Sequence, residues 1–170
     1  VAWLRFDDVR PATLNVYITC DPASSRKRNS DDTVILAMGV DAGRNRWLLD
    51  GYAHKMGLSE RWQKLRDLYL KWTQVPGVQL VKVGYERYGL RDALDHFEER
   101  QEVEKIGFEI IELAWPTAGG NAKFDRIQRL EPDHRGGKWH YAAEPIDQAG
   151  NAIEETRNQA AMRESGQGFR

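Results

Sequence analysis

Apolar and polar residues alternate along several stretches of the chain. In Leu14–Cys20 the side chains at every second position are apolar, so that they share one face, and this period of two is typical of a β-strand. The turn Asp41-Ala42-Gly43 joins two such stretches and predicts an antiparallel hairpin. Further strands are predicted at residues 33–40, 46–53, 78–86 and 108–114.

Apolar residues spaced three and four apart predict helices between the later strands. The first helix carries Trp62, Leu65, Leu68 and Trp72 on its core face, with Ser59 as its N-cap, and ends near residues 76–77. The remaining predicted elements are a helix at residues 90–105 with a stop at Gly107, a short helix at 121–130, a hairpin around 138–142, and an exposed, mobile arm from residue 143.

The order of these elements, β-β-β-α-β-α-β-α, defines an α/β fold class. Three meandering strands followed by alternating helices and strands predict a mixed five-stranded sheet with flanking helices. This is the element order of the RNase H-like fold. The whole chain, 1–170, is predicted to form one domain with its core at about residues 14–142. In this arrangement the first and fourth strands lie side by side and run in the same direction.

Each of these two neighbouring strands ends in an acidic residue, Asp21 or Glu86. Their carboxylates are expected to meet at one edge of the sheet, where open α/β sheets place their sites. Converging carboxylates repel each other unless a cation neutralises them, and oxygen ligands favour Mg²⁺ or Mn²⁺. Two such ions can cleave a phosphodiester. The alternative remains open that Asp21 is a turn residue before Pro22 and that Glu86 is a solvated strand end.

Composition narrows the choice of function. The chain has 170 residues with a formal charge of −1, so it is not a net-basic nucleic-acid binder, although a local basic patch is allowed. The single cysteine, Cys20, excludes a disulfide framework and reads as a small buried residue rather than a nucleophile. No apolar run is long enough to span a membrane, and a reducing cytoplasm is the expected compartment. Because the chain begins with Val1, we expect it to be a piece of a longer protein.

Several short motifs follow one another in a defined order. The first four are Ile18-Thr19-Cys20-Asp21-Pro22-Ala23, Ser30-Asp31-Asp32-Thr33-Val34-Ile35, Gly39-Val40-Asp41 and Trp47-Leu48-Leu49-Asp50. The next are Val83-Gly84-Tyr85-Glu86-Arg87, Lys123-Phe124-Asp125-Arg126-Ile127, and Leu130-Glu131-Pro132 followed by Gly137-Lys138-Trp139. Together they resemble the nuclease domain of tailed-phage terminase large subunits, over about residues 14–142.

The resemblance implies metal-dependent cleavage of double-stranded DNA during viral genome packaging, with a two-metal site of Mg²⁺ or Mn²⁺. Asp21 corresponds to the central metal ligand and Glu86 to the second. Asp31 corresponds to a further catalytic acid, although a turn cap is an equal alternative, and Asp32 stands beside it. The family's third catalytic Asp, in a late Asp-Asp-x-x-Asp-Ala pattern, is not found here, and we expect it beyond Arg170.

Two basic clusters are candidates for contact with DNA phosphates, and solvated basic surfaces are the alternative in both cases. They are Lys123, Arg126 and Arg129 on the short helix, and Arg26, Lys27 and Arg28 after the first strand.

The implied partners are double-stranded DNA, an ATPase motor domain in the same full-length chain, the portal and the small terminase subunit, in the cytoplasm of an infected bacterial host and without a membrane. Two rival functions remain: another RNase H-like nuclease, such as a resolvase or transposase core, and a catalytically silent module that docks DNA or protein.

Overall fold

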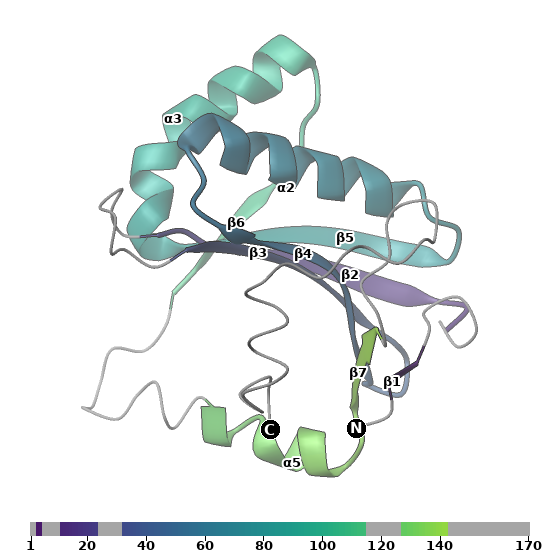
Figure 1. Cartoon of the computed structure of the whole chain (residues 1–170). Coiled ribbons are helices and arrows are strands. Elements are labelled where there is room, and N and C mark those ends of the chain that lie inside the picture. The colour runs from purple at the N-terminus through teal and green to yellow at the C-terminus, as the bar shows by residue number, and fades with distance from the viewer. Residues whose placement is uncertain (1–2, 5–10, 24–31, 115–126, 143–170) are drawn as a thin grey trace.

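The computed structural model describes residues 3–4, 11–23, 32–114 and 127–142. None of the helices in these ranges is long and apolar enough to cross a membrane. Figure 1 shows the elements, which in chain order are β1 (Trp3–Leu4), β2 (Leu14–Asp21), β3 (Thr33–Val40), β4 (Arg46–His54), α2 (Leu58–Thr73), β5 (Val78–Glu86), α3 (Arg87–Glu104), β6 (Ile110–Leu113), α5 (Glu131–Arg135) and β7 (Trp139–Ala142).

The described strands form one mixed sheet in the order β1-β7-β4-β3-β2-β5-β6. Strand β3 is antiparallel to both β2 and β4, whereas β5 is parallel to β2 on one side and to β6 on the other. The predicted five-stranded core is therefore confirmed, with the first and fourth of its strands, β2 and β5, running side by side in the same direction.

The end of the described chain differs from the prediction. Instead of a hairpin around residues 138–142, β7 is a single strand that pairs in parallel with β4 on one side and with β1 on the other. The sequence pattern recognised extended backbone but not its partners, because those partners lie far away in the chain. Most of the predicted helix at 121–130 and all of the arm from residue 143 lie outside the described residues.

Both long helices begin and end at positions that the sequence motifs missed. Helix α2 has Gly57 as its N-cap rather than Ser59. Helix α3 begins at Arg87, directly after β5, with Glu86 itself as the N-cap. It ends at Glu104, three residues before the predicted stop at Gly107, because Lys105 takes the left-handed conformation (φ 52°) that usually belongs to glycine.

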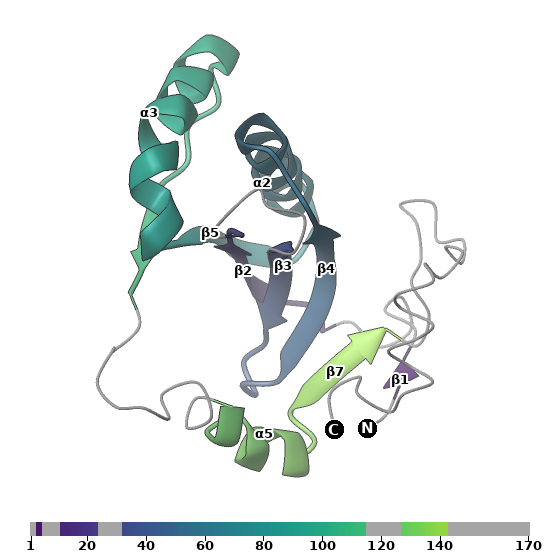
Figure 2. The same ribbon diagram turned by 60° about the vertical axis from the view of Figure 1, so that its left-hand side comes forward.

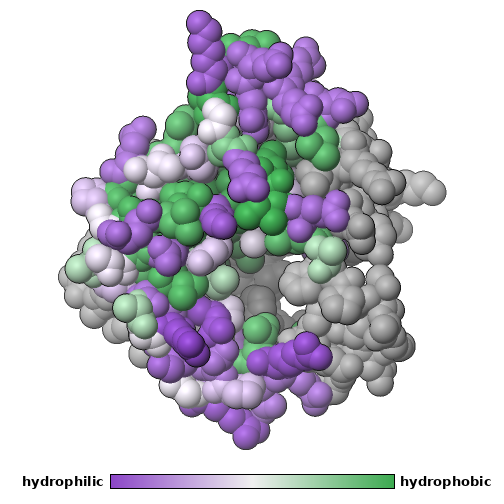
Figure 3. All heavy atoms as spheres, turned by 180° about the vertical axis from the view of Figure 1, so that it is seen from behind, coloured by the Kyte–Doolittle hydropathy of each residue, from purple (hydrophilic) through white to green (hydrophobic). Residues whose placement is uncertain are grey.

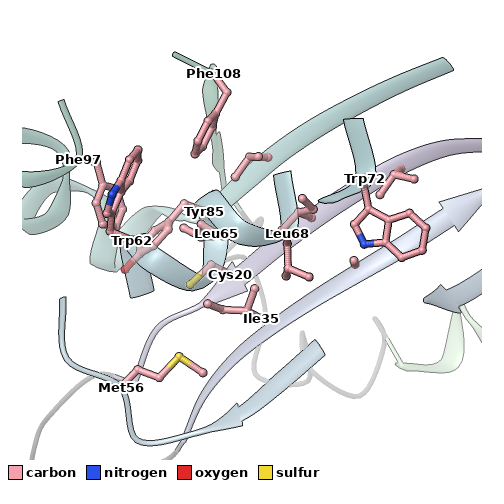
Figure 4. Packing of buried hydrophobic residues seen from close by; sticks show 14 of the residues in the cluster. Cys20, Ile35, Met56, Trp62, Leu65, Leu68, Trp72, Tyr85, Phe97 and Phe108 are labelled. Atoms are coloured by element: carbon pink, nitrogen blue, oxygen red, sulfur yellow. The ribbon is translucent and has the colours of Figure 1, made fainter. Parts of the chain in front are cut away.

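Helices α2 and α3 lie over the same face of the sheet and enclose the core (Figures 1 and 2). The alternating burial of β2 directs Val16, Ile18 and Cys20 toward the helices, as its period of two predicts. Aromatic rings fill the space between the helices and the sheet: fully buried Trp62 stacks on Phe108 with ring centroids 5.5 Å apart. Figure 4 shows this packing, which includes Trp72 as the sequence predicted.

Polar side chains are distributed unevenly over the outside of the molecule. In Figure 3 they dominate the top, where the outer part of α3 lies, and the bottom, where α5 lies, whereas apolar side chains show between them in the middle. Along the sheet face opposite α2 and α3, the described side chains include partly exposed Leu36 on β3 and Leu80 on β5.

Candidate active site

Asp21 and Glu86 end two adjacent parallel strands at the same edge of the sheet. The register of β2 and β5 pairs Cys20 with Tyr85, so the next residue of each strand is an acid. Cys20 and Tyr85 are buried under the helices, and the alternation of a strand therefore directs both acids to the opposite face. Asp21 is exposed and Glu86 is half-buried. The register thus brings together the two acids that the sequence predicted to be neighbours.

Apolar residues flank the two acids across the sheet. Asp21 pairs with Val34 of β3, and Glu86 pairs with Leu113 of β6, which gives the row Val34, Asp21, Glu86, Leu113. Gly84 makes room for Leu113, since a Cβ at position 84 would lie 2.8 Å from Leu113 Cδ1. No basic residue belongs to this row. Carboxylate oxygens are donors of the kind that binds Mg²⁺ or Mn²⁺.

The segment that follows Asp21 is tied to the start of β3. The backbone N–H of Ala23 donates a hydrogen bond to Thr33 Oγ1 at 3.0 Å, and Thr33 is fully buried. Asp32 is exposed and directly precedes Thr33, so it lies at the same edge of the sheet as Asp21. The bond between Ala23 and Thr33 fixes the direction in which the chain leaves Asp21.

Behind the acids, the buried residues Cys20 and Tyr85 are neighbours across the two strands. Burial raises the pKa of the Cys20 thiol to about 12, although the nearby Arg61 charge opposes the rise. The Asp21 and Glu86 carboxylates also raise this pKa, because the charge of each repels the Cys20 thiolate. Cys20 is therefore a protonated, buried side chain and not a nucleophile, as predicted.

Tyr85 is fixed in turn by helix α2. Arg61 Nη1 donates a hydrogen bond to the Tyr85 hydroxyl at 2.7 Å. Burial raises the pKa of Tyr85 to about 12, so the hydroxyl stays protonated. The sequence analysis missed Arg61. Its signal is its position immediately before the fully buried Trp62, where a charged side chain lies at the border of the core face.

Other acids of the terminase-like motifs have structural partners. Asp41 accepts hydrogen bonds from the backbone N–H of Asn45 (2.9 Å), from Asn45 Nδ2 (2.8 Å) and from Trp47 Nε1 (3.1 Å). Partial burial raises the pKa of Asp41, but these hydrogen bonds outweigh it and lower the pKa overall. Asp50 pairs with Lys71 of α2 at 2.8 Å. These two acids stabilise the β3–β4 turn and the packing of α2, respectively.

Most of the remaining predicted site residues lie outside the described ranges. This holds for Asp31, Arg26, Lys27, Arg28, Lys123 and Arg126. Arg129 is described and exposed; it lies just before α5, which is anchored by an ion pair of 2.8 Å between Asp133 and Arg46 at the start of β4. Within residues 3–4, 11–23, 32–114 and 127–142, no three His, Cys, Asp or Glu side chains are close enough together to hold a metal ion.

The strand order, the parallel β2–β5 pair and the two helices on one face define the RNase H-like α/β fold. In structure the chain is similar to the terminase nuclease domain of human cytomegalovirus, with a TM-score of 0.56 at 14% identity over 100% of this chain and 82% of that one. It is also similar to the large terminase nuclease of thermophilic phage G20c with bound magnesium, with a TM-score of 0.50 at 17% identity over 91% of this chain and 80% of that one.

No protein-family model matches the sequence, and no characterised protein matches it in sequence. The structural similarity to terminase nuclease domains confirms, at the level of the fold, the resemblance that the motifs indicated.

Proposed function

We propose that this chain is a divalent-metal-dependent endonuclease domain that cleaves double-stranded DNA during viral genome packaging. The observation that carries the proposal is the pair of acids, Asp21 and Glu86, at the adjacent carboxyl ends of β2 and β5. The fold that holds this pair is shared with terminase nuclease domains, one of which binds magnesium. A pair of neighbouring carboxylates in such a fold, one exposed and one half-buried, favours phosphodiester hydrolysis over a purely structural role.

In this proposal Asp21 and Glu86 hold Mg²⁺ or Mn²⁺ at the edge of the sheet. Held by these residues, such an ion would supply a water of lowered pKa and would stabilise the leaving oxygen of the phosphodiester. The protein binds the metal through oxygen atoms, and apolar Val34 and Leu113 border the pair on either side. A site with two ions needs a further carboxylate, for which we propose an acid beyond Arg170, and we propose Asp31 as a further catalytic acid.

DNA binding requires basic side chains around the acids, because the acids alone repel phosphates. We propose that Arg26, Lys27 and Arg28, with Lys123, Arg126 and Arg129, supply these contacts. The same function places the domain in a longer chain with an ATPase motor. Its further partners are then the portal and the small terminase subunit, in the cytoplasm of an infected bacterial host.

The test is nicking of supercoiled plasmid in Mn²⁺ by the protein extended past Arg170, where the third acid is proposed to lie, with Asp21→Asn and Glu99→Gln compared at equal concentration. Asp21→Asn keeps the size of the side chain but removes the charge that binds the ion, so we expect cleavage to fall by about 100-fold or more. Glu99→Gln is the matched control, because Glu99 is an exposed acid on α3. Its cleavage rate is expected to equal that of the wild-type chain.

Equal cleavage by folded Asp21→Asn and wild-type chains would move the metal site elsewhere. A wild-type chain that binds duplex DNA but never cuts it, with Mg²⁺ or with Mn²⁺, would favour the rival function of a silent DNA-docking module.

A further inference from the structure

A hydrogen bond between a helix and a strand lies directly behind the candidate metal ligands. Cys20 precedes Asp21 on β2, Tyr85 precedes Glu86 on β5, and the register pairs Cys20 with Tyr85. Arg61 of α2 donates a hydrogen bond of 2.7 Å to the Tyr85 hydroxyl. Figure 4 shows Cys20 and Tyr85 next to each other in the core. These contacts join the acid-bearing end of β5 to α2 and, through the strand register, to β2.

Arg61 lowers the stability of the fold at its position in α2. Its Nε atom is buried and has no hydrogen-bond partner, and among the described residues no carboxylate forms an ion pair with its guanidinium. A buried donor without a partner, on a cation without a counter-ion, lowers the stability of the fold. Stability alone thus does not account for an arginine at this position, and its contact with Tyr85 points to the strand end that Tyr85 fixes.

Backbone pairing holds the ends of both strands. Asp21 pairs with Val34 of β3, and Glu86 pairs with Leu113 of β6. The register between β2 and β5 themselves ends at Cys20 and Tyr85, one residue before the acids. Strand β5 then passes into α3 at Glu86 without an intervening loop. Tyr85, held by Arg61, is therefore the last residue of β5 that is paired with β2 before the acid.

From this arrangement we infer that Arg61 and Tyr85 are positioning residues that set the spacing of the Asp21 and Glu86 carboxylates for one divalent ion. The inference rests on the proposed function, because it assumes that these two acids bind the metal. Helix α2 is then part of the metal site even though it supplies no ligand. Groups that orient metal ligands from behind contribute strongly to metal affinity.

The experiment measures Mn²⁺ affinity of the 170-residue chain, by the electron paramagnetic resonance signal of free Mn²⁺, for Tyr85→Phe and Arg61→Lys. Both variants keep the net charge of the chain, so the electrostatic attraction for the ion is preserved while the hydrogen-bonded geometry is lost. We expect the dissociation constant for Mn²⁺ to rise about tenfold in each variant. Tyr69→Phe is the matched control, since Tyr69 packs on Phe108 away from the strand ends, and its affinity should equal that of the wild type.

Thermal unfolding without metal separates positioning from general destabilisation. The midpoint for Tyr85→Phe should stay close to that of Tyr69→Phe, so that the loss of affinity is not a loss of fold. Unchanged Mn²⁺ affinity in Tyr85→Phe, with Asp21→Asn still abolishing binding, overturns this inference and leaves the proposed function intact. Mn²⁺ binding that is absent, or that ignores Asp21→Asn, overturns the proposed function itself, and the inference falls with it. If Arg61→Lys does not fold, Tyr85→Phe decides alone.

Discussion

The carboxylate of Glu104, where α3 meets α2, and that of Asp21, at the end of β2, differ in what surrounds them. Glu104 accepts hydrogen bonds from Trp62 Nε1 (3.0 Å), Arg66 Nη1 (2.8 Å) and Arg100 Nη2 (2.5 Å). Asp21 is exposed, and within the described parts of the chain no hydrogen-bond donor reaches its carboxylate. The first acid has its charge balanced by the protein, whereas the second has oxygen atoms available for a ligand from outside.

The comparison shows that a fold distinguishes structural from functional acids by the donors placed around them rather than by burial alone. Arg66 first, then Trp62 and Arg100, hold the pKa of Glu104 at about 2, because each donor stabilises the ionised form. At the strand ends, the neighbours of the acid pair across the sheet are Val34 and Leu113. In the proposed function a cation would balance the charge of Asp21, whereas arginines already balance the charge of Glu104.

The largest expected effect is on catalysis. Asp21→Asn and Glu86→Gln should each reduce Mn²⁺-supported plasmid nicking by about 100-fold or more, and the double variant should be no worse than either single one. Residues that hold the same ion act as a unit, so removing the second ligand has little left to remove. The measurement is the initial nicking rate of the four proteins. A double variant whose loss is the product of the two single losses would mean that the acids serve separate steps.

The next effect sharpens the other side of the comparison, since it concerns stability and not catalysis. Glu104→Gln removes the charge on which Arg66, Trp62 and Arg100 converge, so the variant should melt at a lower temperature than the wild type at pH 7. The pKa of Glu104 is about 2 in the folded chain, below the usual 4.5 of a glutamate, so its contribution to stability is present above about pH 4.5 and is lost as the pH falls toward 2.

Thermal melting of the two proteins between pH 7 and pH 2.5 measures this contribution. The difference in melting temperature should narrow as the pH falls through this window. A constant difference would assign the effect of Glu104→Gln to packing rather than to charge. Mn²⁺ affinity should be the same in both proteins, because Glu104 lies at the junction of the helices and not at the strand ends.

A smaller effect is expected where the chain leaves Asp21. Thr33→Val keeps the shape of a fully buried side chain but removes the oxygen that accepts the Ala23 N–H. The lost hydrogen bond should lower the free energy of unfolding by about 1–2 kcal/mol. Chemical denaturation measures this change, and Thr73→Val, which alters an exposed threonine at the end of α2, is the control. A Thr33→Val chain as stable as the control would show that Pro22 and the strand pairing alone hold this segment.

The central strands and their order could be predicted from the sequence, because each strand has a local alternation of apolar and polar residues. Strands β2, β3, β4 and β5 match their predicted ranges within one residue, and the element order alone placed Asp21 beside Glu86. The pairing of β7 with β4 was not predictable in this way, because it joins Arg46 to Trp139 across most of the chain. The contact between Arg61 and Tyr85 could not be predicted for the same reason, because no local sequence pattern links these two residues.

The smallest effect belongs to Lys105, which follows Glu104 and ends α3 in a left-handed conformation (φ 52°). A side chain with a Cβ is strained there, whereas glycine is not, and Lys105 is exposed, so little packing is lost on its removal. Lys105→Gly should therefore raise the free energy of unfolding by about 0.5–1 kcal/mol, after the greater flexibility of glycine in the unfolded chain is counted. Denaturant titration measures the change. Plasmid nicking by Lys105→Gly should equal that of the wild type, because the junction of α2 and α3 supports the fold and leaves the acids at the strand ends untouched. A change in Mn²⁺ affinity without a change in stability would contradict this division between the two regions.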